Sequence, residues 1–140
     1  CAEDAGIQSA IAVASNGMLA APSPQFAEMM RIGLERTKAM TAGRIDVEGV
    51  LASMSPADYD RMRPTVRAAD LVDKNILLIG ASRDMVAPLE TCHRPIAQAM
   101  RDAGVRVFDE VILDTDHGFL TKRIALSRLT IEWLRQRSGF

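Results

Sequence analysis

Two polar residues, Asp84 and His117, follow strand-like apolar segments and have the side chains needed for acid–base chemistry. Asp84 comes shortly after residues 75–80, and His117 comes shortly after residues 107–113. Functional groups of a parallel α/β sheet gather at the carboxyl ends of its strands, so we expect these side chains to meet above the sheet. A carboxylate bound to Nδ1–H fixes the tautomer of a histidine ring, and Nε2 then faces a nucleophile as a general base. Gly118 would let backbone or substrate come close to the ring.

The order of strand-like and helical segments predicts the scaffold that would hold this pair. Continuous apolar runs over residues 7–14, 75–80 and 107–113 are typical of parallel strands covered on both faces. Apolar residues with helical spacing indicate helices over residues 89–103 and 120–137. The second half of the chain therefore runs strand, helix, strand, helix. This order predicts an α/β fold with a parallel sheet and right-handed crossovers.

The stretch between the first two predicted strands, residues 15–70, is predicted to be an all-helical insert. Its predicted helices cover residues 25–40, residues 47–54, a segment that begins at Pro56 and ends at Pro64, and residues 65–69. Six of the eight methionines of the chain lie in this insert. Methionine fills irregular gaps in a core and also lines adaptable apolar binding surfaces, so both roles stay open here.

Composition places the chain among ordinary globular proteins. Of its 140 residues, 48% are hydrophobic and 25% are charged, and the formal net charge is −1. A dedicated nucleic-acid-binding protein usually has an excess of basic residues, so we expect no nucleic-acid partner. The apolar runs are also far shorter than the roughly 18 residues that a membrane span needs, so we expect no membrane partner.

The chain starts at Cys1 and enters the first predicted strand almost at once, without the pattern of a signal peptide. Cys1 could be an N-terminal nucleophile or the lipidated first residue of a lipoprotein. The favoured interpretation is the tail of a helix whose beginning is missing, so we expect the chain to lack an N-terminal part. Cys1 and Cys92 could form one disulfide bond or none, and neither lies in a metal-binding spacing.

Three motifs follow one another in the second half of the chain. They are Leu77-Leu78-Ile79-Gly80-x-x-x-Asp84-x-Val86-x-Pro88, Asp116-His117-Gly118-Phe119, and Ile131-Glu132-Trp133-Leu134. Together they resemble the C-terminal part of an α/β-hydrolase, most closely one of the prolyl-oligopeptidase-like and esterase group. The resemblance extends over about residues 1–137 and is most specific between residues 75 and 134.

The resemblance implies that Asp84 is the acid and His117 the base of a Ser-Asp-His triad, because the acid of this family follows the seventh strand and the histidine follows the eighth. It implies a core of residues 1–14 and 71–140, with residues 15–70 as a lid or cap. The implied activity is that of a serine hydrolase of esterase or peptidase type, without cofactor or metal. Its substrate would be a small-molecule ester or a peptide.

The chain departs from the family pattern because no G-x-S-x-G motif occurs in it. The resemblance therefore places the nucleophilic serine and the oxyanion hole upstream of Cys1, with residues 1–5 as the end of the helix that follows the serine. A three-stranded parallel sheet that begins at Ile7 would also leave an apolar edge unpaired. We expect the missing N-terminal half of the same fold as a partner, and we expect this chain alone to be inactive.

Residues near the pair allow other interpretations. Asp114 and Asp116 could be the acid, although their closeness to His117 in sequence favours local turn hydrogen bonds. The same three residues could hold a metal ion, although such clusters without a second His or Cys are common by chance. The segment Gly80-Ala81-Ser82-Arg83 could suggest a dinucleotide loop, but the G-x-G-x-x-G glycines are absent.

Three further residues are expected to have no part in the chemistry. His93 is predicted to lie on the solvated surface, and Trp133 is predicted to pack in the core. Arg83 is predicted to be a surface charge, with binding of a substrate carboxylate as the alternative. The rival to a hydrolase is a non-catalytic α/β binding or partner module, in which the Asp84–His117 pair is incidental.

Overall fold

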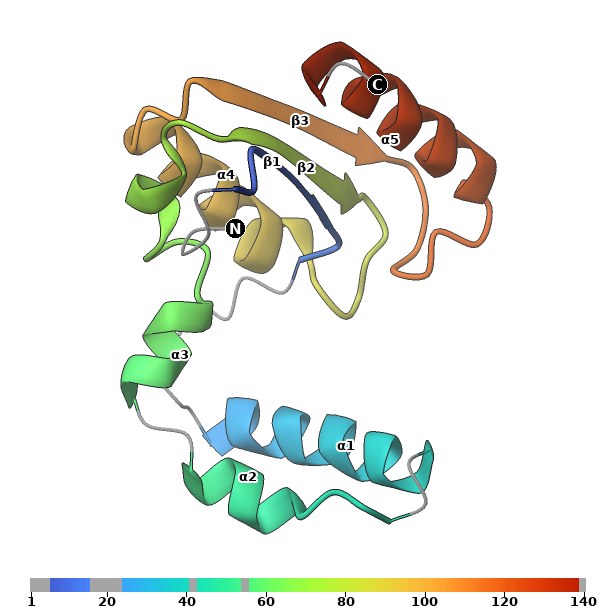
Figure 1. Ribbon diagram of the computed structural model, residues 1–140. Helices are drawn as coiled ribbons and strands as arrows, with labels where there is room; N and C mark the ends of the chain where they lie inside the picture. Colours follow the sequence, from blue (N-terminus) through green and yellow to red (C-terminus); the bar gives the residue numbers. More distant parts are fainter. Residues whose placement is uncertain (1–5, 16–23, 41–42, 54–55, 139–140) are drawn as a thin grey trace. The chain divides into compact units, whose positions relative to one another are not determined.

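The structure is a computed structural model that describes residues 6–15, 24–40, 43–53 and 56–138 (Figure 1). The chain divides into two compact units. One, the sheet unit, consists of Cys1–Leu19 and Pro64–Phe140, and the other, the helical unit, is Ala20–Arg63. The expectation that residues 1–5 end a helix lies outside the described residues.

Three parallel strands form the sheet of the sheet unit, in the order β1, β2, β3. They are β1 (Ser9–Val13), β2 (Asn75–Ala81) and β3 (Val107–Leu113). Ala81 at the end of β2 lies opposite Leu113 at the end of β3, so the two strands end at the same edge of the sheet. The three predicted strands and the parallel α/β character are confirmed.

Helices cover both faces of this sheet, α4 (Arg94–Asp102) on one side and α5 (Arg123–Ser138) on the other (Figure 1). Successive residues of a strand point to opposite faces, so a strand covered on both sides is apolar throughout. Leu77, Leu78 and Ile79 of β2 are accordingly all buried. The buried residues of the two cores are Ala68, Ile76, Leu78, Ile96, Ala97, Met100 and Val105 on the α4 side, and Leu77, Ile79, Ala81, Phe119 and Trp133 on the α5 side. The predicted core position of Trp133 is confirmed.

The helix predicted over residues 89–103 is present in two parts. A wider π turn, Leu89–His93, comes first, and α4 follows it directly. α4 ends before Gly104, whose φ of +73° is a left-handed conformation that favours glycine. The helix predicted over residues 120–137 begins only at Arg123, because the residues before it form hydrogen-bonded turns.

The helix predicted over residues 65–69 is wrong. The structure has a 3-10 turn there instead, Ala68–Leu71. Five residues are too few to offset the entropy cost of starting an α-helix in isolation. Ala68 is only 3% exposed and packs in the α4-side core, so its burial fixes where the chain turns before β2.

Three helices make up the helical unit. They are α1 (Pro24–Met40), α2 (Val47–Ser53) and α3 (Pro56–Met62). Their positions confirm, within the described residues, the three helices predicted before residue 65. The Asp46 carboxylate accepts a hydrogen bond from the Gly49 amide at 3.0 Å and so caps the start of α2. An ion pair between Arg31 and Glu48 joins α1 to α2.

The structure describes the side chain of one methionine of the insert, Met40. Met40 is 87% exposed. The side chains of the other five, which are Met18, Met29, Met30, Met54 and Met62, lie outside the described residues. Whether they fill a core or line a binding surface therefore stays a prediction.

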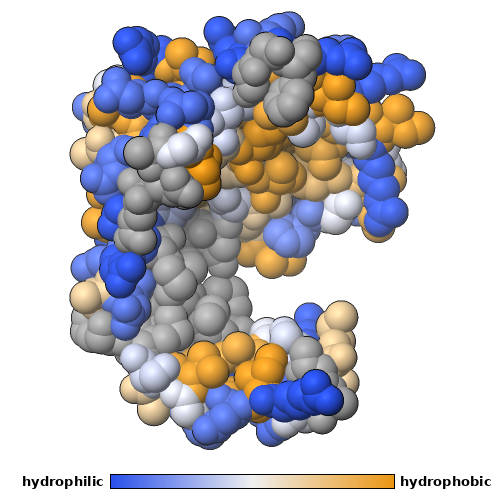
Figure 2. All heavy atoms as spheres, viewed as in Figure 1, coloured by the Kyte–Doolittle hydropathy of each residue, from blue (hydrophilic) through white to orange (hydrophobic). Residues whose placement is uncertain are grey.

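β1 lies at an edge of the sheet, where the sequence predicts an unpaired strand that starts at Ile7. Within the described residues it pairs with β2 on one side only. Ile7, two residues before β1, and Val13, its last residue, are each 39% exposed. Figure 2 shows apolar residues at the surface of the sheet unit around this strand. The outer side of β1 thus combines exposed apolar side chains with backbone groups that a further strand could bind.

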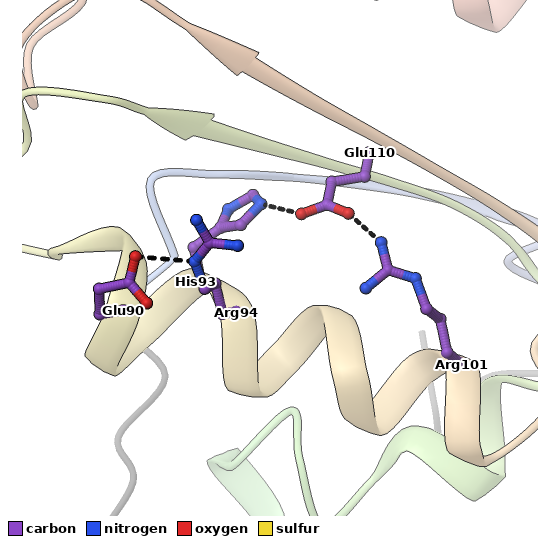
Figure 3. A network of polar contacts seen from close by, with 5 residues as sticks. All are labelled: Glu90, His93, Arg94, Arg101 and Glu110. Atoms are coloured by element: carbon purple, nitrogen blue, oxygen red, sulfur yellow. Dashed lines mark hydrogen bonds and ion pairs between the residues drawn. The ribbon is translucent and has the colours of Figure 1, made fainter.

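Two consecutive acids of β3, Asp109 and Glu110, point to opposite faces, and each binds the element that covers its face. Asp109 Oδ2 accepts a hydrogen bond from Trp133 Nε1 of α5 at 2.7 Å. Glu110 Oε1 lies 2.9 Å from His93 Nε2, and the same carboxylate pairs with Arg101 of α4 (Figure 3). One strand therefore holds both helical layers through charge-assisted contacts.

The surface position predicted for His93 is wrong, since this residue is only 3% exposed. Its polar neighbours Glu90 and Arg94 do lie at the surface, where they form an exposed ion pair at 2.8 Å (Figure 3). The ring itself packs against Gly80 of β2, where an added Cβ would lie 2.6 Å from His93 Nδ1. The polar partner that makes this burial possible is Glu110, which sequence neighbours of His93 do not reveal.

Burial raises the pKa of the Glu110 carboxyl, but the hydrogen bonds from His93 and Arg101 outweigh burial, so this pKa lies below its ordinary value. A carboxyl whose pKa is lower in the folded than in the unfolded state stabilises the fold above the unfolded pKa. This contribution is lost as the pH falls through the folded pKa.

We predict that Glu110→Gln lowers the free energy of unfolding at neutral pH by about 1.5–3 kcal/mol, the range for hydrogen bonds to charged groups. The deficit should shrink when the pH is lowered to about 3, where carboxyl groups become protonated. Urea denaturation at both pH values measures this difference in the free energy of unfolding. Glu90→Gln removes only the exposed pair with Arg94, so this control should lose less than about 1 kcal/mol. Equal losses in the two variants would contradict the role given to Glu110.

Candidate functional site

Two loops leave the same edge of the sheet. The acid loop, residues 82–88, follows β2, and the histidine loop, residues 114–122, follows β3. Ser82 continues the strand pairing for one residue, because its amide donates to the Leu113 carbonyl at 2.9 Å. The parallel register thus brings Asp84 and His117 to one place, as the sequence predicts.

Asp84 and His117 form a direct hydrogen bond. His117 Nδ1 lies 2.8 Å from Asp84 Oδ2. The Asp84 side chain is completely buried, whereas 45% of the His117 side chain is exposed. A buried carboxylate therefore holds an imidazole ring that faces solvent.

The Asp84 carboxylate also accepts two backbone hydrogen bonds within its own loop. Oδ1 lies 2.8 Å from the Val86 amide nitrogen and 2.7 Å from that of Ala87. Burial raises the pKa of Asp84, but these amides and His117 together outweigh burial and hold the pKa below its ordinary value. Asp84 is therefore ionised at neutral pH despite its burial.

This ionisation decides the tautomer of His117. An ionised carboxylate can only accept hydrogen bonds, so Nδ1 of His117 carries the hydrogen that Asp84 accepts. When the ring is neutral, Nε2 is then unprotonated and has a free lone pair. On a half-exposed ring, Nε2 in this state can take a proton from a nucleophile or from water.

The histidine loop is fixed by contacts of its own. Asp116 caps the turn, since its carbonyl accepts the Phe119 amide at 3.1 Å and its Oδ1 accepts the Leu120 amide at 3.2 Å. The local turn bonds predicted for Asp116 are confirmed. Phe119 is only 4% exposed and has a φ of +53°, a left-handed conformation that a bulky residue rarely adopts. Burial of this ring in the α5-side core holds the strained turn, a role that the sequence analysis missed.

Asp114 does not make the local turn bonds predicted for it. Its Oδ1 accepts a hydrogen bond from Ser82 Oγ at 2.9 Å and lies 3.0 Å from Arg83 Nε, and both partners belong to the acid loop. Arg83 is exposed, as predicted, but it is paired with Asp114. Ser82 is the serine nearest to Asp84 in sequence, and its hydroxyl binds Asp114 and not His117.

The alternative of a metal site at Asp114, Asp116 and His117 finds no support in the structure. In the described ranges, no group of three or more His, Cys, Asp or Glu side chains is arranged to hold a metal ion. The same part of the chain contains no helix that is long and apolar enough to cross a membrane.

Comparison of the sequence with known proteins found no match. The chain matches no protein-family model, and a search of curated proteins found no match. The function of the site therefore has to be argued from its own geometry.

We predict that Asp84→Asn changes the tautomer of His117. The Asn side chain can keep its oxygen on the Val86 and Ala87 amides, which places its NH2 group against Nδ1, so the neutral ring should carry its hydrogen on Nε2 instead. The ¹⁵N chemical shifts of the neutral imidazole distinguish the two tautomers. Asp116→Asn keeps an acceptor for the Leu120 amide and should leave the tautomer unchanged. An unchanged tautomer in Asp84→Asn would contradict the assignment.

Proposed function

We propose that this chain is the C-terminal part of an α/β-hydrolase and that the protein is a serine hydrolase that acts on an ester or amide (peptide) carbonyl. The observation that carries the proposal is the 2.8 Å bond between buried Asp84 and half-exposed His117. The two residues follow neighbouring parallel strands in the order acid, then histidine, which is their order in this family.

In the proposed reaction, a serine outside residues 1–140 attacks the carbonyl carbon of the substrate. His117 Nε2 takes the proton of the serine hydroxyl as the bond from serine oxygen to carbonyl carbon forms, and it returns this proton to the leaving group as the bond to that group breaks. A water molecule, deprotonated by His117 Nε2 in the same way, then attacks the acyl-serine, and the proton returns to the serine oxygen as the acid is released. Asp84 keeps Nδ1 protonated and stabilises the imidazolium while it exists. The pH-independent charge of Asp84 around neutrality suits this role, because its pKa lies below the ordinary value.

The nucleophile requires a partner segment, which we propose to be the N-terminal half of the same fold. Its strands would continue the sheet beyond β1. The one-sided pairing of β1 within the described residues supports this, as do the exposed side chains of Ile7 and Val13. A parallel strand at this edge would satisfy the outer backbone groups of β1 and cover the apolar surface around it.

We propose further that residues 15–70 form a lid or cap over an apolar part of the substrate. The helical unit Ala20–Arg63 is a compact body inserted in the chain between β1 and β2, which supports this assignment. In the sheet unit, Met85 and Val86 next to Asp84 are 89% and 59% exposed. Exposed apolar side chains so close to the candidate acid also favour a substrate with an apolar group.

The proposal predicts that His117→Ala in the complete protein lowers the rate of hydrolysis of a p-nitrophenyl ester by about 10⁴-fold or more, the scale of triad removal. Release of p-nitrophenol measures the rate. Asp84→Asn should also lose activity strongly, whereas Asp73→Asn, an exposed acid paired with Arg106, should keep it. Circular dichroism establishes that each variant is folded. A rate for His117→Ala near that of the original protein would overturn the hydrolase assignment and favour the non-catalytic module.

A further inference from the structure

The loops that carry Asp84 and His117 are joined by a second set of contacts, centred on Asp114. Asp114 Oδ1 accepts a hydrogen bond from Ser82 Oγ at 2.9 Å and lies 3.0 Å from Arg83 Nε. The backbone carbonyl of Asp114 accepts a bond from Arg83 Nη2 at 3.1 Å. One residue of the histidine loop thus binds the two residues that directly precede Asp84.

Each loop otherwise fixes its own functional side chain internally. The Asp84 carboxylate is held by the amides of Val86 and Ala87, and the turn that carries His117 is held by Asp116. These bonds set the position of each side chain within its loop. They do not set the position of one loop relative to the other.

The distance between the loops depends on a small number of contacts. The backbone contributes two, from the Ser82 amide to the carbonyl of Leu113 at the end of β3 and from the Arg83 amide to the Thr115 carbonyl, at 2.9 and 3.0 Å. In the described part of the chain, the hydrogen bonds and ion pairs that side chains make between the loops are those that involve Arg83, Ser82 and Asp114, and the Asp84–His117 bond itself. Besides the pair itself, the Asp114 carboxylate is thus the side-chain group that links the two loops by polar contacts.

We infer that Asp114 is a positioning residue, which sets the hydrogen-bond geometry between Asp84 and His117 through Ser82 and Arg83. The inference rests on the proposed hydrolase function and deepens it. A misplacement of about 1 Å in a catalytic group can cost about 10²-fold in rate, so a contact that fixes this geometry has a direct effect on turnover.

Because the side chains of Asp114 and Arg83 are exposed, their contacts can position the loops without adding much to the stability of the fold. The side chains of Arg83 and Asp114 are 62% and 76% exposed. Ion pairs at such exposed sites contribute little to the stability of a fold. Loss of the Asp114 carboxylate should therefore leave the protein folded and equally stable, with the backbone bonds between the loops kept, while Ser82 and Arg83 lose their bonds to that carboxylate.

The test compares Asp114→Ala with Asp73→Ala in the complete protein. Asp73 is a matched control, because it is also an exposed aspartate of the sheet unit and pairs with an arginine, Arg106, at 3.3 Å. We expect Asp114→Ala to lower kcat for p-nitrophenyl ester hydrolysis about tenfold, with KM and Tm unchanged. In NMR spectra, the His117 Nδ1 proton should move upfield and exchange faster with water as its bond to Asp84 weakens. Asp73→Ala should change none of these quantities.

A conservative variant distinguishes positioning from simple loss of charge. Asp114→Asn keeps an oxygen that can accept the Ser82 hydroxyl and the Arg83 guanidinium, so it should recover most of the kcat and of the His117 signal. A Tm that falls together with kcat in Asp114→Ala, without recovery in Asp114→Asn, would overturn the inference.

The two readouts also separate this inference from the function on which it rests. If the protein hydrolyses the ester but Asp114→Ala behaves like Asp73→Ala, the positioning role is wrong and the hydrolase stands. If the original protein hydrolyses nothing but the His117 proton signal changes only in Asp114→Ala, the proposed function is wrong and the structural effect of Asp114 on the pair stands.

Discussion

Parallel pairing of β2 with β3, in the register that sets Ala81 opposite Leu113, determines where the candidate site forms. Asp84 and His117 are 33 residues apart in the sequence, yet their side chains lie 2.8 Å apart because both loops leave the sheet at one edge. A slip of one residue would displace one strand by about 3.3 Å and turn its side chains to the opposite face. Such a displacement exceeds the tolerance of any hydrogen bond, so the pair depends on this register.

The register is in turn held by both helical layers. β2 is buried on its two faces, which fixes the direction of every side chain along it. β3 is less buried, and it uses Asp109 and Glu110 to bind α5 on one face and the π turn and α4 on the other. These hydrogen bonds have strict requirements of distance and angle, which a shifted β3 would not meet. The two acids therefore specify the position of β3 as well as stabilising it.

Asp84 and His117 each meet one of two requirements that a single residue could not meet at once. An acid–base group must be reached by substrate, and it must also be held in one orientation. Asp84 is buried and is kept ionised by two amides and the histidine, so it supplies a fixed charge. His117 is half exposed and takes its orientation from that charge. Phe119, Asp116 and Asp114 serve the same purpose. Their contacts hold the backbone of the histidine loop and leave the His117 ring accessible.

The sequence by itself determined the strands, most helices and the residues of the pair, because apolar runs, helical spacing and residues at strand ends are local patterns. It did not reveal that His93 is buried or that Asp114 binds the neighbouring loop, because the partners that decide both, Glu110 and Ser82 with Arg83, lie far away along the chain. It also placed a helix at residues 65–69, where burial of Ala68 imposes a 3-10 turn. Only the tertiary structure decided these points, since burial and hydrogen bonding of a polar side chain depend on which distant residue the fold brings against it.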